Sequence, residues 1–248
     1  MQKLPSNKKI ATPAVTFNEV GVFYKKHSKN LIKNILNGPK GHWAIENVSF
    51  EINKGDVLGI VGNNGAGKST TLLLIGEVIS SDRGTVNTYN NKAMLLTINT
   101  GIMKNLSGRK NIMLLGLAIG IERKKIIASM DKIIEFSELE KFIDDPVETY
   151  SSGMQSRLGF STALMLTPDI LLVDEVLGVG DRDFKKKSTD ALKEKIQHSD
   201  STAIITSHDR ETILELCNKA LWIDKGKSIV FGDPEDVIKS YENSSKTI

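Results

Sequence analysis

Apolar side chains along this chain fall into two patterns, and each predicts a different kind of element. Short runs that alternate with polar residues, or that are apolar throughout, are typical of β-strands. Fully apolar runs are expected where a parallel sheet is covered on both faces. The strands predicted in this way are 15–24, 44–52, 57–61, 170–173 and 203–206, with a final pair on either side of residues 225–227.

Apolar residues at helical spacing predict helices between these strands. One begins at Lys68 and runs to about residue 79, another covers residues 184–196, and residues 108–166 are mainly helical. The clearest apolar stripe of the long helical region is formed by Ile126, Ile127, Met130, Ile133 and Ile134. Because strands alternate with helices, the sequence predicts an α/β fold with a helical insertion in the middle and a closing helix after Pro234.

The composition is that of a globular protein rather than a disordered one. The 248 residues have a mass of 27.3 kDa, with 40% hydrophobic and 25% charged residues. The single cysteine, Cys217, cannot form an internal disulfide, which favours a reducing compartment. The longest apolar run, residues 112–121, is far shorter than the roughly 20 residues of a membrane-spanning helix, and the N-terminus carries no secretory signal. We therefore expect a soluble, cytoplasmic protein.

Positive charge is concentrated at the start of the chain. Residues 1–40 contain eight lysines and one acidic residue, although the formal net charge of the whole chain is only +3. Such a region is either a solvated edge or a surface for anionic lipid or nucleic acid. Aromatic residues make up 6% of the chain, and none is interleaved with the lysines to stack on bases. No nucleic acid partner is therefore expected.

Residues 62–70 carry the strongest chemical signal. They match the pattern G-x-x-x-x-G-K-[ST] between a predicted strand and a predicted helix, which is the context this motif requires. The glycines let backbone N–H groups point inward around phosphates, and the helix start adds its positive dipole. We expect Lys68 to contact the β- and γ-phosphates of a nucleoside triphosphate and Ser69 to ligate Mg²⁺. The nucleotide-binding residues predicted here are Gly62, Asn63, Asn64, Gly65, Ala66, Gly67, Lys68, Ser69 and Thr70.

Two acidic residues follow the apolar run 170–173. The C-terminal ends of parallel strands meet at one edge of a sheet, so we expect Asp174 near the phosphate loop as a second Mg²⁺ ligand. Glu175, one residue further, is expected to act as general base on the attacking water. An acidic pair at a strand end is often only a surface or capping pair, but its combination with the phosphate loop favours the catalytic interpretation.

A second anion-binding helix start is predicted just before the run 170–173. Its sequence is Tyr150-Ser151-Ser152-Gly153-Met154-Gln155-Ser156-Arg157. Hydroxyl groups and a glycine at a helix start can bind an anion, although an ordinary helix cap looks the same. The segment resembles the signature motif of ATP-binding-cassette (ABC) ATPases, usually L-S-G-G-Q, with Tyr150 at the leucine position and Ser152 and Met154 replacing a glycine and the glutamine. The helical insertion upstream is similar to that family as well.

The resemblance implies a fold and further roles. The fold is that of a P-loop NTPase with a parallel-sheet core, an antiparallel β lobe and a helical subdomain. Asp181, at the end of the segment 178–181, stands at the position of the family's D-loop aspartate, and His208 stands at that of its switch histidine. The residues 151–153 become candidate nucleotide contacts. The expected nucleotide is ATP, bound with Mg²⁺.

Two family positions stay open. The aromatic ring that stacks on adenine is either Tyr24 or Trp43. Tyr24 has the family's position after the first strand, but the basic stretch follows it, and Trp43 on the other side of that stretch could take the same role. The Q-loop glutamine of the family has no counterpart between residues 85 and 107, where Thr97 and Asn99 are the nearest polar candidates.

Longer stretches are similar to one branch of the family, the ATPases that export bacterial surface polysaccharides. These are residues 150–163 and 174–187, Gly101, and the segment 106–111. The implied function is ATP hydrolysis that powers polysaccharide export, with an O-antigen type of polymer as the first interpretation. A teichoic acid or capsule exporter is the alternative, and an importer or a soluble non-transport ABC ATPase fits less well.

The same resemblance implies partners and a location. ABC ATPases of this kind form head-to-tail dimers with a second copy of themselves and drive an integral-membrane transporter subunit, present in two copies. We therefore expect a peripheral protein at the cytoplasmic face of the inner (plasma) membrane. It would meet the polysaccharide only indirectly.

The chain is expected to form one nucleotide-binding domain over residues 1–248, with a helical subdomain at about 105–166 and no C-terminal carbohydrate-binding domain. A basic insertion at about 25–41 separates the first two strands. Within it, residues 28–39 have the apolar spacing of a short amphipathic helix. That helix either packs on the protein's own sheet or contacts anionic lipid at the membrane surface.

Overall fold

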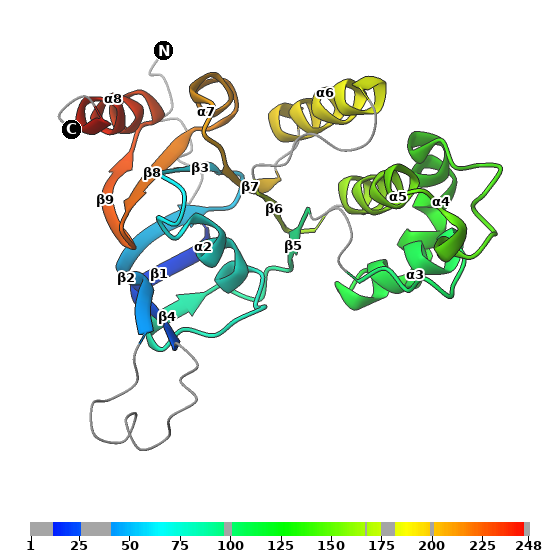
Figure 1. Ribbon diagram of the computed structural model, residues 1–248, viewed down its shortest axis with the longest axis horizontal. Coiled ribbons are helices and arrows are strands. Elements are labelled where there is room, and N and C mark those ends of the chain that lie inside the picture. Colours follow the sequence, from blue (N-terminus) through cyan, green and yellow to red (C-terminus); the bar gives the residue numbers. More distant parts are fainter. Residues whose placement is uncertain are drawn as a thin grey trace, which may run out of the picture.

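The structure is a computed structural model, and its elements form two lobes. It describes residues 12–25, 41–96, 101–166, 168–174, 182–198 and 201–245. One lobe is built on two sheets, and the other consists of three helices (Figure 1). We call the first the sheet lobe and the second, residues 101–166, the helical subdomain.

A six-stranded sheet forms the centre of the sheet lobe. Its strands stand in the order β5-β6-β7-β3-β8-β9, in which only β9 runs antiparallel to its neighbour. They span Ala93–Leu95 (β5), Ile170–Asp174 (β6), Thr202–Thr206 (β7), Val57–Val61 (β3), Lys219–Asp224 (β8) and Lys227–Gly232 (β9). The central strands are buried on both faces, which explains their unbroken apolar sequences.

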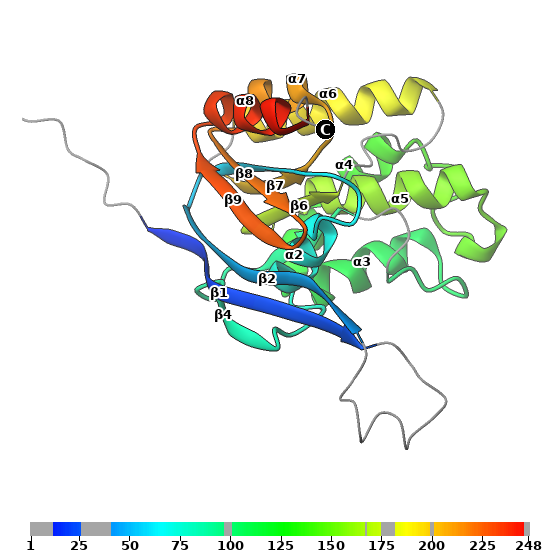
Figure 2. The ribbon, with the colours of Figure 1, turned by 60° about the vertical axis from the view of Figure 1, so that its left-hand side comes forward.

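Each face of this sheet has its own core. On one face lie α6 (Arg182–His198), α7 (Arg210–Leu216) and α8 (Pro234–Ser245), which Figure 2 shows side by side along the top. The other face packs against α2 (Lys68–Ile75) and the smaller antiparallel sheet. That sheet has the order β2-β1-β4, with bounds Gly41–Asn53, Pro13–Lys25 and Arg83–Asn87. The residues of β3 alternate between the two cores, with Leu58 and Ile60 on the side of the smaller sheet.

The helical subdomain has a third, separate core. Its elements are α3 (Gly108–Ala118), α4 (Arg123–Ser137), a 3₁₀ turn η1 (Val147–Thr149) and α5 (Ser152–Met165). Ile112, Ile126, Ile133 and Leu158 are fully buried between them. Of the apolar stripe predicted on the second of these helices, Ile127 was wrongly included, because 50% of its surface is exposed.

The predicted fold class is confirmed, and most predicted strands and helices lie where the sequence placed them. The helix from Lys68 ends at Ile75 rather than near residue 79, because Gly76 closes it and Glu77 takes a left-handed backbone with φ of 54°. The strands β4 and β5 and the helix α7 were not predicted. The basic insertion lies largely outside the described residues. Within the part of the chain that the structure describes, none of the helices combines the length and apolar character needed to cross a bilayer.

Candidate functional site

The phosphate loop connects the end of β3 to the start of α2, as its sequence predicted. Gly67, directly before α2, has a φ of 116°, and a Cβ atom there would lie 2.8 Å from the carbonyl oxygen of Ala44. The turn between β8 and β9 also supports the loop, since the Gly226 N–H donates to the Ala66 carbonyl at 2.9 Å. The path of the loop is therefore fixed by backbone contacts that admit only glycine at residue 67.

Lys68 is held inside this loop. Only 6% of the surface of Lys68 is exposed. Its Nζ donates to the carbonyl oxygens of Gly62 (2.8 Å) and Asn63 (3.3 Å). The Asn63 carbonyl also accepts from the Ala66 N–H at 3.0 Å. A buried ammonium group at the start of a helix provides the positive charge that a phosphate requires.

Two oxygen-bearing side chains of the site are candidate ligands of Mg²⁺. Ser69 is exposed in the first turn of α2, and Asp174 is the last residue of β6. Because β6, β7 and β3 are parallel neighbours, the end of β6 faces the same sheet edge as the phosphate loop. Thr206 of β7 donates its hydroxyl to Asp174 Oδ1 at 2.6 Å, which fixes the carboxylate. A hydroxyl and a carboxylate are hard oxygen ligands of the type that Mg²⁺ prefers, so these residues fit the predicted metal.

His208 follows β7 and reaches the phosphate loop, which is consistent with its predicted place. Its Nε2 lies 3.3 Å from Lys68 Nζ and 3.0 Å from Asn64 Oδ1. The next residue, Asp209, caps α7 by accepting hydrogen bonds from the hydroxyl and N–H of Thr212, and these bonds lower its pKa. The cap therefore fixes the start of α7 beside the histidine.

A cavity of about 260 Å³ opens over the phosphate loop, and the structure separates the two candidate aromatic residues around it. Tyr24 lines this cavity. Trp43 does not, because it packs on the other face of the strand pair, where Phe23 lies edge-on at 5.3 Å and Arg83 lies 4.5 Å from the indole ring. The cross-strand partner of Tyr24 is His42, which also lines the cavity, with the two rings 6.0 Å apart. His42 was not predicted as a site residue from the sequence.

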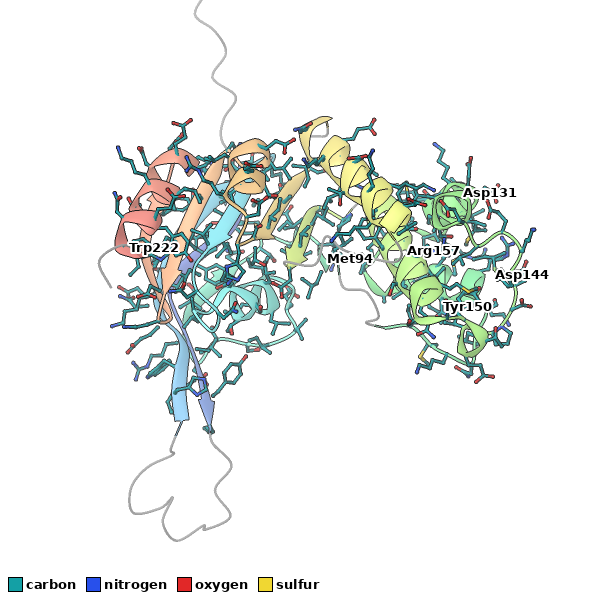
Figure 3. All side chains as sticks on the ribbon, turned by 45° about the horizontal axis from the view of Figure 1, so that its top comes forward. Met94, Asp131, Asp144, Tyr150, Arg157 and Trp222 are labelled. Atoms are coloured by element: carbon teal, nitrogen blue, oxygen red, sulfur yellow. The ribbon has the colours of Figure 1, made fainter. Side chains whose placement is uncertain are left out.

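The predicted signature segment lies on the helical subdomain, away from the phosphate loop of the same chain. Ser151 caps α5, its hydroxyl oxygen accepting from the Met154 N–H at 3.2 Å, and Ser151 and Ser152 are exposed. At Gly153 an added Cβ would meet only the Ser151 hydroxyl, at 3.9 Å. The helix start is thus open to an approaching anion. Figure 3 shows Tyr150, which directly precedes this helix start, on the helical subdomain, whereas α2 belongs to the sheet lobe.

Buried hydrogen bonds hold this segment in place. Tyr150 donates its hydroxyl to the Phe142 carbonyl at 2.5 Å, and burial raises its pKa. Asn111 is fully buried, and its side chain bonds to backbone groups of Met103, Leu106 and Ser107 at 2.7–3.2 Å. Leu106 in turn accepts from the Val147 N–H at 2.9 Å, so the segment 106–111, singled out in the sequence, supports the turn that leads into α5.

A polar and aromatic contact joins α5 to α6. Glu138, at the end of α4, accepts from Arg157 of α5 at 3.0 Å and from Lys187 of α6 at 2.8 Å. The rings of Phe160 and Phe184 meet edge-on at 6.2 Å beside this pair. Arg157 is labelled in Figure 3 at the side of α5 that faces α6. The helical subdomain is therefore tied to the helix that follows the Asp174 segment.

Some predicted residues lie outside the described part of the chain. These are Glu175, Asp181, Thr97 and Asn99. Their predicted roles stay predictions. Among the described candidates, the structure brings together the phosphate loop, His208 and Tyr24, and it places Asp174 at the same sheet edge.

Comparisons with known proteins agree with this arrangement. A family model described as "ABC transporter" matches residues 45–178. The chain is 38% identical over 223 residues to the O-antigen export system ATP-binding protein RfbB of Klebsiella pneumoniae, covering 90% of this chain and 88% of that protein. It is 43% identical over 218 residues to the teichoic acids export ATP-binding protein TagH of Lactococcus lactis subsp. lactis (strain IL1403), covering 88% of this chain. The match spans 46% of that TagH and 43% of a second TagH, from Bacillus anthracis, so this chain corresponds to less than half of each of these two relatives.

Solved structures of low sequence identity share the fold. The ATP-binding cassette MJ0796 in a dimeric post-hydrolysis state bound to ADP and Pi has a TM-score of 0.68 at 21% identity, covering 89% of this chain and 98% of that chain. A second dimeric structure of the same cassette has a TM-score of 0.70 at 20% identity, with the same coverage.

Proposed function

This chain belongs to the ABC transporter family, and we propose that it is the ATP-hydrolysing subunit of a transporter that exports a cell-surface polysaccharide. The observation that carries the proposal is the 38% identity to an O-antigen export ATP-binding protein over 88% of that protein's length. The family model spans the phosphate loop, the start of α5 and Asp174, so the similarity includes most of the candidate site.

In the proposed reaction, Lys68 neutralises the β- and γ-phosphates of ATP, and the N–H groups of the phosphate loop orient them. Ser69 and Asp174 would hold Mg²⁺, which neutralises charge on the phosphates when bound. Glu175 would take a proton from the attacking water. His208, already 3.3 Å from Lys68 Nζ, would complete the contacts on the transferred phosphate. Tyr24 is the proposed partner of the adenine ring, since it lines the cavity over the loop and Trp43 does not.

The exposed start of α5 supports a dimer of two copies. One chain presents two helix starts suited to anions, at Lys68 and at Ser151–Gly153, but on different lobes (Figure 1). In a head-to-tail arrangement, Ser151, Ser152 and Gly153 of one copy would close over ATP bound to the other. Asp181 would lie at the same dimer contact.

An exposed apolar surface supports a membrane-spanning partner. Leu114 and Leu117 of α3 are 42% and 46% exposed. The end of α3 also borders a groove of about 350 Å³ shared with the end of α2 and with β5. Exposed apolar side chains beside a groove are typical of a protein interaction site. A partner bound there would contact both lobes, so it would sense their relative movement.

The exported polymer is a cell-surface polysaccharide, of the O-antigen type in our first interpretation. Teichoic acid is the alternative, because relatives named for its export are 39–43% identical over similar lengths. The transporter subunit would act at the cytoplasmic face of the plasma membrane, and the polymer would pass through the partner rather than bind this chain.

Glu175→Gln tests the proposal directly. The variant should bind ATP as tightly as the wild type, and it should hydrolyse ATP about 10²- to 10⁴-fold more slowly, because a general base contributes about that much. Expressed in place of the wild type in the source bacterium, it should abolish surface polymer. Chemical analysis of the polymer that disappears would identify the substrate.

Lys68→Ala is the matched control, because it should lose ATP binding rather than turnover alone. Near wild-type hydrolysis by Glu175→Gln would contradict the assignment of the base. Unchanged surface polymers in cells carrying only Glu175→Gln would contradict the export function.

A further inference from the structure

The last helix of the structure contacts the phosphate loop. Tyr241 of α8 donates its hydroxyl to Asn63 Oδ1 at 3.2 Å, although the two residues are 178 positions apart. Asn63 is the first residue after Gly62 in the loop, and its side chain is exposed. No contact of this kind was predicted from the sequence, because the phosphate-loop pattern allows any residue at position 63.

Asn63 is also the residue on which the internal bonds of the loop converge. Its carbonyl oxygen accepts from the Ala66 N–H at 3.0 Å and from Lys68 Nζ at 3.3 Å. The Tyr241 hydroxyl therefore bonds to the side chain of the same residue whose carbonyl oxygen accepts from Lys68 Nζ. Whatever fixes Asn63 also restricts the turn that positions Lys68.

Tyr241 is itself held in a defined place. Its ring meets the ring of Trp222 on β8 edge-on at 5.8 Å, and Val237 and Ile238 of α8 are buried in the core below. Trp222 is labelled in Figure 3, on the sheet beside α8. The neighbouring Glu242 accepts from Arg210 of α7 at 3.3 Å. The α8 helix is therefore anchored to the sheet and to the helix that follows His208.

We propose that Tyr241 is a positioning residue that pre-orders the phosphate loop for ATP by holding Asn63. This inference rests on the proposed ATP site. An exposed loop loses conformational freedom when it closes around a ligand, and each ordered residue costs free energy at that moment. A loop that is already tied to α8 has less freedom to lose. The tie should therefore strengthen ATP binding without taking part in hydrolysis.

Tyr241→Phe tests the proposal, because it removes the hydroxyl and keeps the ring that packs on Trp222. The dissociation constant for ATP, measured by calorimetry, and the KM should both rise about 2- to 10-fold, which is the effect of one lost hydrogen bond. The kcat should stay unchanged. Tyr89→Phe is the matched control, since it removes an exposed tyrosine hydroxyl that lies 3.0 Å from Thr16 on β1, and it should alter neither constant.

A double-mutant cycle gives the sharper result. If Tyr241 acts through Asn63, then Tyr241→Phe combined with Asn63→Ala should weaken ATP binding no more than Asn63→Ala alone. Additive effects, an unchanged KM in Tyr241→Phe, or a loss confined to kcat would each overturn the proposal. Lys68→Ala distinguishes an error in the role of Tyr241 from an error in the proposed ATP site. If it loses ATP while Tyr241→Phe behaves as the wild type, only the role of Tyr241 is wrong; if it binds ATP normally, the proposed site itself is wrong.

Discussion

The two lobes each contain a helix start suited to a phosphate group, but each helix start is held in place by different means. In the sheet lobe the phosphate loop is shaped by backbone: Gly67 has a left-handed φ of 116°, and the residue that follows it, Lys68, is 6% exposed. In the helical subdomain the start of α5 is exposed, and side chains hold it. Tyr150 bonds to the Phe142 carbonyl, and Asn111 holds Leu106, which accepts from the Val147 N–H. The first site tolerates almost no change in its main chain, whereas the second depends on a few hydrogen bonds.

The cores of the lobes differ in the same way. The sheet lobe has two cores that share one sheet, so its strands cannot shift without disturbing both faces. The helical subdomain has a core of its own, but its helix α5 also buries Phe160, Ala163 and Leu164 in one core of the sheet lobe. Ion pairs of Glu138 with Arg157 and Lys187 lie at the same border. The helical subdomain is therefore joined to the sheet lobe mainly through one helix, α5, rather than through a shared sheet. Such a joint would let the two halves of the proposed ATP site approach and separate.

Exchanging glycine for alanine in each lobe should give the largest contrast. Gly67→Ala places a Cβ in a left-handed backbone, 2.8 Å from the Ala44 carbonyl, and strain of this type costs about 1–3 kcal/mol. Calorimetry should show ATP affinity lowered about 10- to 100-fold. Gly153→Ala meets only one atom, at 3.9 Å, and should leave ATP affinity of the isolated chain within about twofold of the wild type. Equal losses in both variants would show that the two sites are equally constrained.

Replacing a buried asparagine in each lobe should give a contrast of intermediate size. Asn111→Ala removes four hydrogen bonds to the backbone of residues 103–107 and should lower the free energy of unfolding by about 1–3 kcal/mol. Hydrogen exchange should accelerate in residues 101–166 and stay slow in β3 and β7. Asn91→Ala, which removes bonds to Ala14 and Thr88 in the sheet lobe, is the matched control and should spare the helical subdomain. Faster exchange throughout both lobes in Asn111→Ala would mean that they unfold together.

The smallest effect is a pH dependence at the border between α5 and α6. Lys195 of α6 donates to the Leu164 carbonyl, and burial lowers its pKa from 10.5 to about 8. Between about pH 8 and pH 10.5 the unfolded chain binds more protons at this lysine than the folded protein, so the free energy of unfolding rises with pH. The urea midpoint of the wild type should therefore increase from pH 7 to pH 9.5 relative to that of Lys195→Met. Cys217, whose pKa burial raises to about 12, has the opposite dependence above pH 9, but it is common to both proteins and cancels in the difference.

The continuous motifs of the site could be predicted from the sequence. The phosphate loop is one segment of nine residues between a strand and a helix, and each feature it needs is local. The strand before Asp174 is equally plain, because burial on both faces leaves a purely apolar sequence. The sheet order that brings Asp174 and Thr206 together then follows from parallel pairing.

What the sequence did not reveal depends on pairings between distant segments. His42 lies beside Tyr24 only because of the register of β1 with β2. The sequence between the two strands does not predict that register. The strand β5 has three residues and α7 has seven, which is too short for a periodic pattern to stand out. Ile127 fits a helical stripe in sequence but faces solvent, since the stripe is wider than the surface that α4 buries.

The order of strands in the large sheet also determines when the site can assemble during synthesis. The strand β3, which leads into the phosphate loop, pairs only with β7 and β8, which are made more than 140 residues later. The support from Gly226 and the contact from Tyr241 are made later still. The helical subdomain, by contrast, is one continuous segment with mostly local contacts, the type of topology that folds early. We therefore expect a growing chain to order this subdomain before its phosphate loop, because the strands that support the loop are made later.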